Sequence, residues 1–139
     1  MNFFYRLQPV RDNINQKNPK TGLMPMAVSI GSVDLDKLAK SIAERTSYSR
    51  PVVKAILQEM VDETERLLSL GQNVTLGDLG TFSVSAEGPI VETLDDIRGT
   101  SIKLKRIVHR PSRTMTKRLK DVPWERVAWE KSTARPRKK

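Results

Sequence analysis

The largest group of side chains able to do chemistry consists of lysines and arginines in the last third of the chain. Residues 98–139 carry a net charge of +12 and residues 1–97 carry −3, which accounts for the +9 of the whole chain. Lysine and arginine side chains neutralise phosphates without needing a catalytic partner. We therefore expect the following residues to contact a nucleic acid backbone: Arg98, Lys103, Lys105, Arg106, Arg110, Arg113, Lys117, Arg118, Arg135, Arg137, Lys138 and Lys139.

The same cations also fit a second interpretation, in which they form only a solvated surface. Lys103 and Lys105 would then protect a strand edge from aggregation. The basic residues near the C-terminus would serve solubility. The unequal distribution of charge along the chain favours the nucleic acid interpretation.

The sequence does not indicate catalysis or metal binding. His109 is the only histidine and cysteine is absent, so no nucleophile–base pair or metal cluster can be assembled from these residues. The adjacent acidic residues have simpler explanations: Asp34 as a helix cap, and Asp95 with Asp96 as part of an exposed loop. We predict a protein that is not an enzyme and that uses no metal, cofactor or small-molecule substrate.

Length and composition predict one compact domain with appendages. The chain has 139 residues, of which 37% are hydrophobic and 5% aromatic, so a second copy is expected to cover part of a thin core. The N-terminus lacks the basic and apolar segments of a signal peptide, and no apolar run reaches membrane-spanning length. The lack of cysteine fits a reducing compartment, and we expect a cytoplasmic protein without membrane contact.

Alternation of apolar and polar residues predicts two strands near the N-terminus. The first covers residues 2–10 and is expected to end at Pro9. The second covers residues 24–30, and residues 11–22 between them are predicted to form a loop. The two strands can pair as a hairpin with a long loop or join separate sheet edges.

Two helices are predicted next. Asp34 is expected to cap a first helix that ends near Thr46. Ser49 is expected to cap a second helix, with Pro51 in its first turn and Gly71 at its end. Its apolar residues keep one face for about five turns. The short link between the helices predicts a helical hairpin.

The segment from Gln72 to Phe82 alternates apolar residues around two glycines, which predicts a β-hairpin or a sharply bent pair of strands. Gly77 and Gly80 are expected to adopt a positive φ, which Leu or Val could not adopt cheaply. The ring of Phe82 is expected to anchor the local core. Residues 85–100 are predicted to form a loop.

A strand and a short basic helix are predicted after this loop. Residues 102–110 alternate, with Leu104 and Val108 expected on one face and lysines on the other. Ile107 is out of phase, which indicates a β-bulge. Ser112 is expected to cap the helix that follows.

This order of elements resembles the HU / integration host factor family of bacterial histone-like DNA-binding proteins, over residues 33 to about 122. The most specific part is Val-Thr-Leu-Gly-Asp-Leu-Gly-Thr-Phe at 74–82, which looks like the family's strand turn after its helical hairpin. Arg-Pro-Ser-Arg at 110–113 and Leu-Lys-Asp-Val at 119–122 look like the two ends of its final helix. The N-terminal extension and basic C-terminal tail resemble a longer branch of HU-like proteins.

The resemblance implies an α+β fold, in which an N-terminal helical hairpin is followed by a β-saddle with an arm and a short C-terminal helix, plus extra N-terminal strands. It also implies an intertwined homodimer. The expected domains are a β extension at 1–32, an HU-like DNA-binding domain at 33–130 and a disordered basic tail at 131–139. The expected dimer core consists of Val53, Ile56, Leu57, Met60, Leu67, Leu76, Leu79 and Phe82.

The function implied by the resemblance is that of a nucleoid-associated protein, which binds double-stranded DNA largely without sequence specificity and bends or compacts it. Residues 85–102, equivalent to the family's basic arm, instead hold four acidic residues and Arg98. An acidic arm is repelled by phosphate. The alternative is therefore a structural or protein-interaction module that has lost DNA bending. Residues 17–22, Lys-Asn-Pro-Lys-Thr-Gly, look like an arm tip, and are either an ordinary turn or a relocated DNA-contacting loop.

Overall fold

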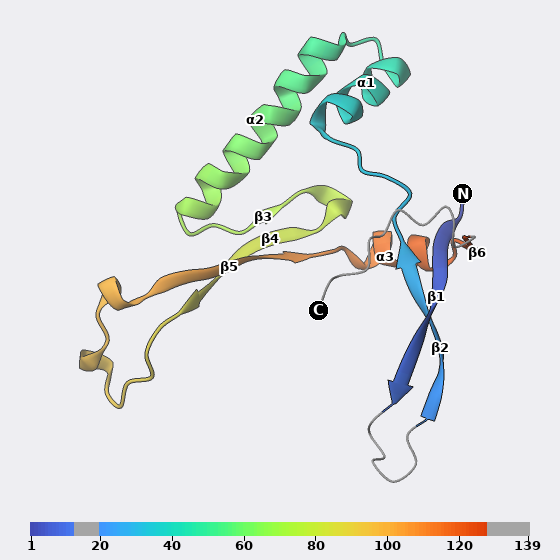
Figure 1. The fold of residues 1–139 in the computed structure, drawn as a ribbon. Helices are drawn as coiled ribbons and strands as arrows, with labels where there is room; N and C mark the ends of the chain where they lie inside the picture. Colours follow the sequence, from blue (N-terminus) through green and yellow to red (C-terminus); the bar gives the residue numbers. More distant parts are fainter. Residues whose placement is uncertain (13–19, 128–139) are drawn as a thin grey trace. The chain divides into compact units, whose positions relative to one another are not determined.

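The computed structural model describes residues 1–12 and 20–127 (Figure 1). These residues separate into two compact units: residues 1–12, 20–33 and 120–127 belong to unit 1, and residues 34–119 form unit 2. The elements in chain order are β1 (Phe3–Asp12), β2 (Lys20–Val28), α1 (Leu35–Arg45), α2 (Arg50–Ser69), β3 (Val74–Thr75), η1 (Gly77–Leu79), β4 (Thr81–Glu87), η2 (Leu94–Asp96), η3 (Gly99–Ser101), β5 (Lys103–Arg110), α3 (Arg113–Lys120) and β6 (Trp124–Arg126).

Unit 1 is built around a three-stranded sheet with the order β2-β1-β6. β1 and β2 form an antiparallel hairpin, which confirms the first of the two pairings considered for these strands. β6 pairs in parallel with β1, and the rings of Phe3 and Trp124 lie 4.9 Å apart between centroids. Segments from near both ends of the chain therefore build one sheet.

The prediction that Pro9 ends the first strand is wrong, and so are the predicted loop limits of 11 and 22, because β1 continues to Asp12 and β2 begins at Lys20. The rest of the predicted loop lies outside the described residues. The backbone N–H of Phe3 donates to Pro123 and the carbonyl of Tyr5 accepts from Val127, so these alternate positions of β1 face away from β2. Pro9 occupies the same phase of the strand. Its missing N–H therefore removes no hydrogen bond from the hairpin.

α1 and α2 have the predicted limits, although the Ser49 side chain at the start of α2 makes no capping hydrogen bond. The Asp34 carboxylate caps α1 by accepting a hydrogen bond from the Lys37 N–H at 2.9 Å. α2 ends before Gly71, whose φ is +81°. Ala39 of α1 and Val53 of α2 are buried. Small and apolar residues at these two positions allow the helices to approach each other.

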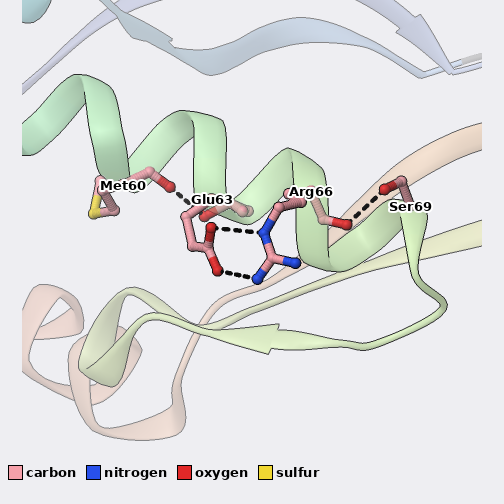
Figure 2. A network of polar contacts seen from close by, with 5 residues as sticks. Met60, Glu63, Arg66 and Ser69 are labelled. Carbon is pink, nitrogen blue, oxygen red and sulfur yellow. Dashed lines mark hydrogen bonds and ion pairs between the residues drawn. The ribbon is translucent and has the colours of Figure 1, made fainter.

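Exposed polar contacts along α2 follow the helical repeat (Figure 2). Arg66 donates to both carboxylate oxygens of Glu63, and the Ser69 hydroxyl donates to the Arg66 carbonyl. The Thr64 hydroxyl donates to the Met60 carbonyl. Exposed contacts of this kind contribute little to stability, so α2 depends on the packing of its apolar side.

The second sheet lies in unit 2 and has the order β3-β4-β5. β4 and β5 form a long antiparallel ribbon, joined at one end by the loop that contains η2 and η3 (Figure 1). We call this loop, residues 88–102, the arm. α3 follows β5 at the opposite end of the ribbon, so the arm and α3 are separated by the length of β5.

The predicted order of elements is wrong. The chain does not begin with a helical hairpin that leads into a β-saddle: strands come first, and three helices are interspersed with six strands in two small sheets. The α+β class itself holds. The physical reason is that β1 and β2 do not serve as an edge extension of the second sheet. They pair with each other and with β6, and so form a separate sheet.

The core is thin, as the composition predicted. Within the described residues, the buried hydrophobic side chains are Val28, Ala39 and Val53. No described helix combines the length and the apolar character required to cross a membrane.

Candidate nucleic-acid interface

The Gly-Asp-Leu-Gly turn brings the start of β4 against the end of β5. The turn is closed by a hydrogen bond of 2.9 Å from the Leu76 N–H to the Gly80 carbonyl. Gly77 and Gly80 have φ values of +53° and +109°, which confirms the predicted backbone conformation. A Cβ at position 80 would overlap the Arg110 carbonyl oxygen, so only glycine fits there.

The same turn anchors α3. The Ser112 hydroxyl accepts a hydrogen bond from the Met115 N–H at 3.1 Å, as predicted for a helix cap, and donates to the Asp78 carbonyl at 2.6 Å. The Asp78 carboxylate accepts a hydrogen bond of 2.8 Å from Arg118. This turn thus fixes the position of α3 and of its basic residues relative to β5.

The register of β4 and β5 divides their ribbon into two faces, because directly opposed residues point to the same side. One face is apolar and lies next to α2, since its residues share a groove with Val61 and Leu68. It consists of Phe82, Val84, Ala86, Leu104, Ile107 and His109. The other, called the basic face below, consists of Thr81, Ser83, Ser85, Glu87, Lys103, Arg106, Val108 and Arg110.

The predicted bulge is present in β5. The pairing passes from Ser85 opposite Arg106 to Ala86 opposite Leu104, which leaves Lys105 as the inserted residue. The insertion shifts the phase of the strand by one. Leu104 therefore faces α2 while Val108 lies on the basic face, and the prediction that these two share a face is wrong.

Three hydroxyl side chains of the basic face were missed by the sequence reasoning: those of Thr81, Ser83 and Ser85. They alternate with apolar residues along β4. Thr81 lies opposite Arg110 and Ser85 opposite Arg106, whereas Ser83 lies opposite Val108. Serine and threonine hydroxyls are among the groups that bond phosphate oxygens in protein–DNA complexes. The alternation in Thr-Phe-Ser-Val-Ser was the signal that could have identified them.

The predicted cations of α3 differ in their surroundings. Arg113 and Lys117 are exposed, whereas Arg118 is held by Asp78. The ion pairs among the described residues are Asp36–Lys54, Glu63–Arg66 and Asp78–Arg118. No other predicted DNA-contacting cation in residues 1–12 and 20–127 takes part in an ion pair.

Two further groups of predicted residues are not part of this face. Arg98 is exposed in the arm, beyond the point where the ladder ends at the pair of Glu87 with Lys103. The tail cations Arg135, Arg137, Lys138 and Lys139 lie outside the described residues. Residues 17–19 of the Lys-Asn-Pro-Lys-Thr-Gly segment do so too, and residues 20–22 are the first residues of β2.

The apolar face of the ribbon is only partly covered by α2. Leu104 and Ile107 remain 61% and 58% exposed, and Ile56 of α2 is 58% exposed. The predicted dimer-core residues differ in how deeply they are buried. Val53 is buried, Leu57, Leu67, Leu76 and Phe82 are half-buried, and Ile56, Met60 and Leu79 are exposed.

His109 has a local structural contact. Its Nε2 lies 2.7 Å from the Leu79 carbonyl oxygen, which can only accept, so Nε2 carries the proton. Its ring lies against Phe82, with 4.8 Å between centroids. The part of the chain that the structure describes contains no group of three His, Cys, Asp or Glu residues arranged to hold a metal ion.

The groups with shifted pKa values lie on α1 and α2. A hydrogen bond from Lys54, aided by its charge, lowers the pKa of Asp36. A hydrogen bond from Arg66 lowers the pKa of Glu63, and the same bond raises the pKa of Arg66 (Figure 2).

Comparison with known proteins gives a family match and matches to solved structures. The family described as "HU domain fused to wHTH, Ig, or Glycine-rich motif" matches residues 1–126. No curated protein matches significantly. The crystal structure of a candidate bacterial DNA-binding protein from Bacteroides vulgatus ATCC 8482 has a similar fold, with a TM-score of 0.61 and 11% identity. The match covers 89% of this chain, which spans 48% of that protein. Because the family match includes both units up to β6, this chain belongs to the HU-HIG family of HU-like proteins.

Proposed function

We propose that this protein binds double-stranded DNA with little sequence preference through its basic face and α3. The observation that carries the proposal is the position of Lys103, Arg106 and Arg110 on the side of the ribbon turned away from α2, where no described acidic residue forms an ion pair with them. Contacts from such side chains to phosphates supply affinity and orientation but read no sequence.

The cations predicted from the sequence have graded roles in this proposal. Lys103, Arg106 and Arg110 form the centre, and Arg113 and Lys117 extend it along α3. Lys105, at the bulge, and Arg118, shared with Asp78, contribute less. Arg98 and the tail residues add charge through counterion release. The hydroxyls of Thr81, Ser83 and Ser85 are additional phosphate contacts in this proposal.

The partly covered apolar face supports a homodimer. Exposed large apolar side chains on a ribbon and helix that belong to one unit, Leu104, Ile107 and Ile56, favour a second copy as the cover. A dimer would double the number of phosphate contacts. We propose that such a dimer is nucleoid-associated in the cytoplasm and bends or compacts DNA, with residues 33–130 as its DNA-binding domain and 131–139 as a basic tail.

Membership of the HU-HIG family and the described role of the B. vulgatus protein are consistent with this proposal. The similarity at 11% identity concerns the fold, and the similar protein is about twice as long. The DNA-binding proposal for this chain therefore depends on its own basic residues.

A salt titration of binding to a short duplex tests the proposal. For about 6–10 phosphate contacts, affinity should fall roughly 10³–10⁵-fold between 50 and 200 mM salt. Replacing Lys103, Arg106 and Arg110 by alanine should reduce the slope by about one per residue. A control with Lys37, Lys40 and Arg45 of α1 replaced removes the same charge elsewhere. Equal effects of the two triple variants, or a flat salt response, would contradict the proposal.

The acidic arm favours a second candidate, a protein-interaction module that keeps the fold without bending DNA. Three acidic residues, Glu92, Asp95 and Asp96, against Arg98 make arm contact with phosphate unfavourable. Measuring the end-to-end distance of a labelled duplex by energy transfer separates the two candidates. A shortened distance on binding supports bending, and a straight or unbound duplex supports the interaction module.

A further inference from the structure

The end of the arm combines exposed apolar side chains with negative charge. Ile90 and Leu94 are 103% and 93% exposed. The acidic residues of this segment are Glu92, Asp95 and Asp96. We call residues 90–98 the arm tip.

The arm tip has a defined local backbone. The Asp96 N–H donates to the Thr93 carbonyl at 3.2 Å, and at the return of the arm the Ser101 N–H donates to the Arg98 carbonyl at 2.9 Å. The 3-10 turn η2 thus holds Leu94, Asp95 and Asp96 in one short segment, and η3 forms the return of the arm. Apolar side chains presented on such a segment and surrounded by carboxylates suit a partner that offers cations beside an apolar contact.

Both surfaces needed for such a contact occur on unit 2 of every molecule. The arm tip is acidic, whereas the basic face and α3 are basic, and Leu119 at the end of α3 is 46% exposed. The ribbon separates the arm tip from α3, because β5 runs from the arm to α3. A second copy therefore presents the complementary surface whenever the first copy presents its arm tip.

We propose that the arm tip of one molecule docks on the basic face and α3 of a second copy. The carboxylates of Glu92, Asp95 and Asp96 meet Arg106, Arg110, Arg113 and Lys117, and Ile90 and Leu94 are the apolar anchors. We place this contact between one proposed homodimer and the next, where it is heterologous and extends beyond a closed dimer.

This contact competes with DNA, and that part of the inference rests on the proposed function. Arm tip and phosphate require the same cations, so each weakens the other by linkage. Protein without DNA assembles through its arms, and duplex DNA dissociates the assembly by binding to the basic face. The arm tip is thus an anionic segment of the protein itself, and it reduces binding of other anions to the basic face when DNA is absent.

Sedimentation velocity without DNA tests the contact directly. At low salt, wild-type protein should form species larger than a dimer, and these should disappear at high salt. The arm variant Asp95→Lys/Asp96→Lys and the face variant Arg106→Glu/Lys117→Glu should each associate roughly ten-fold or more weakly. The control Glu44→Lys/Glu59→Lys makes the same charge change as the arm variant on α1 and α2 and should assemble as the wild type does.

Mixing the two reversed variants gives the sharpest test, because each supplies the charge that the other lacks. The mixture should regain assembly that neither variant shows alone. Circular dichroism spectra of each variant verify folding. Assembly of the arm variant at wild-type strength, or a mixture that stays apart, would overturn the inference. The inference would also be overturned if removal of residues 128–139 abolished assembly as the arm variant does, while the face variant still assembled. The tail would then be the partner of the arm tip.

A separate titration with duplex DNA distinguishes this inference from the proposed function. If assembly follows the arm and face variants but no DNA binds, the proposed function fails and the docking contact stands. If DNA binds and the arm variant assembles normally, the docking contact fails alone.

Discussion

The Arg118 guanidinium lies 2.8 Å from the Asp78 carboxylate, and this pair ties α3 to the turn between β3 and β4. The two residues are 40 positions apart in sequence. The Ser112 hydroxyl, which donates to the Asp78 carbonyl, makes a second connection to the same turn. One acidic residue thus orients a helix whose other cations remain without acidic partners among the described residues.

The ion pair predicts that Arg118 contributes less to DNA affinity than Arg113. Arg118→Ala removes a cation already balanced by Asp78, whereas Arg113→Ala removes one without an ion pair. The Arg113 variant should show the larger loss of affinity and the larger fall in salt slope, by about one. Fluorescence anisotropy with the same duplex measures both. A greater loss for Arg118→Ala would contradict this assignment.

Gly80→Ala should destabilise the protein strongly. The new Cβ overlaps the Arg110 carbonyl, and the φ of +109° is one that residues with a side chain rarely adopt. We expect a loss of more than about 2 kcal/mol in the free energy of unfolding. Gly77→Ala is the matched control, since it has a positive φ but open space around the position, and it should cost about 1 kcal/mol. Urea unfolding measures both, and equal losses would show that the close approach to Arg110 does not matter.

Charged substitutions on the apolar face should separate the proposed homodimer. Ile107→Lys places a charge at a position that is 58% exposed in one chain, so the monomer tolerates it while a covered interface does not. Light scattering after size exclusion should show the mass of one chain, 15.8 kDa, in place of two. Val108→Lys on the opposite face is the control, and it should leave the mass of the wild type unchanged.

The Asp36–Lys54 pair predicts an acid-dependent contribution to stability. The hydrogen bond from Lys54 lowers the pKa of Asp36 from its ordinary value of 3.8 in the folded chain. A lowered folded-state pKa stabilises the protein above the ordinary value, and this stabilisation is lost as the pH falls through the folded value. The wild type should therefore melt above Asp36→Asn near neutral pH, with the difference shrinking below pH 3.8.

Glu44→Gln serves as the control for that experiment, since Glu44 forms no ion pair within the described residues. Its melting temperature should follow the wild type at every pH. A difference between wild type and Asp36→Asn that persists unchanged into strong acid would show that the ion pair is not its source. Because the pair is exposed, the expected difference is small and requires calorimetry or closely spaced melting curves.

The sequence alone was sufficient for features that depend on neighbouring residues. The helix cap at Asp34, the end of α2 before Gly71 and the positive φ of Gly77 and Gly80 all follow from the local chemistry of a few adjacent residues. The position of β5 and the cap of α3 by Ser112 were also predicted correctly. The thin core followed from composition.

Tertiary structure decided what depends on residues far apart in sequence. β6 pairs with β1 across the length of the chain, and this pairing places the N-terminal strands in a sheet separate from that of β3, β4 and β5. The bulge at Lys105 reversed the face of Val108, because an inserted residue changes the phase of every residue on one side of it. Alternation shows that a strand has two faces, and only pairing with β4 and packing against α2 show which residues share each one.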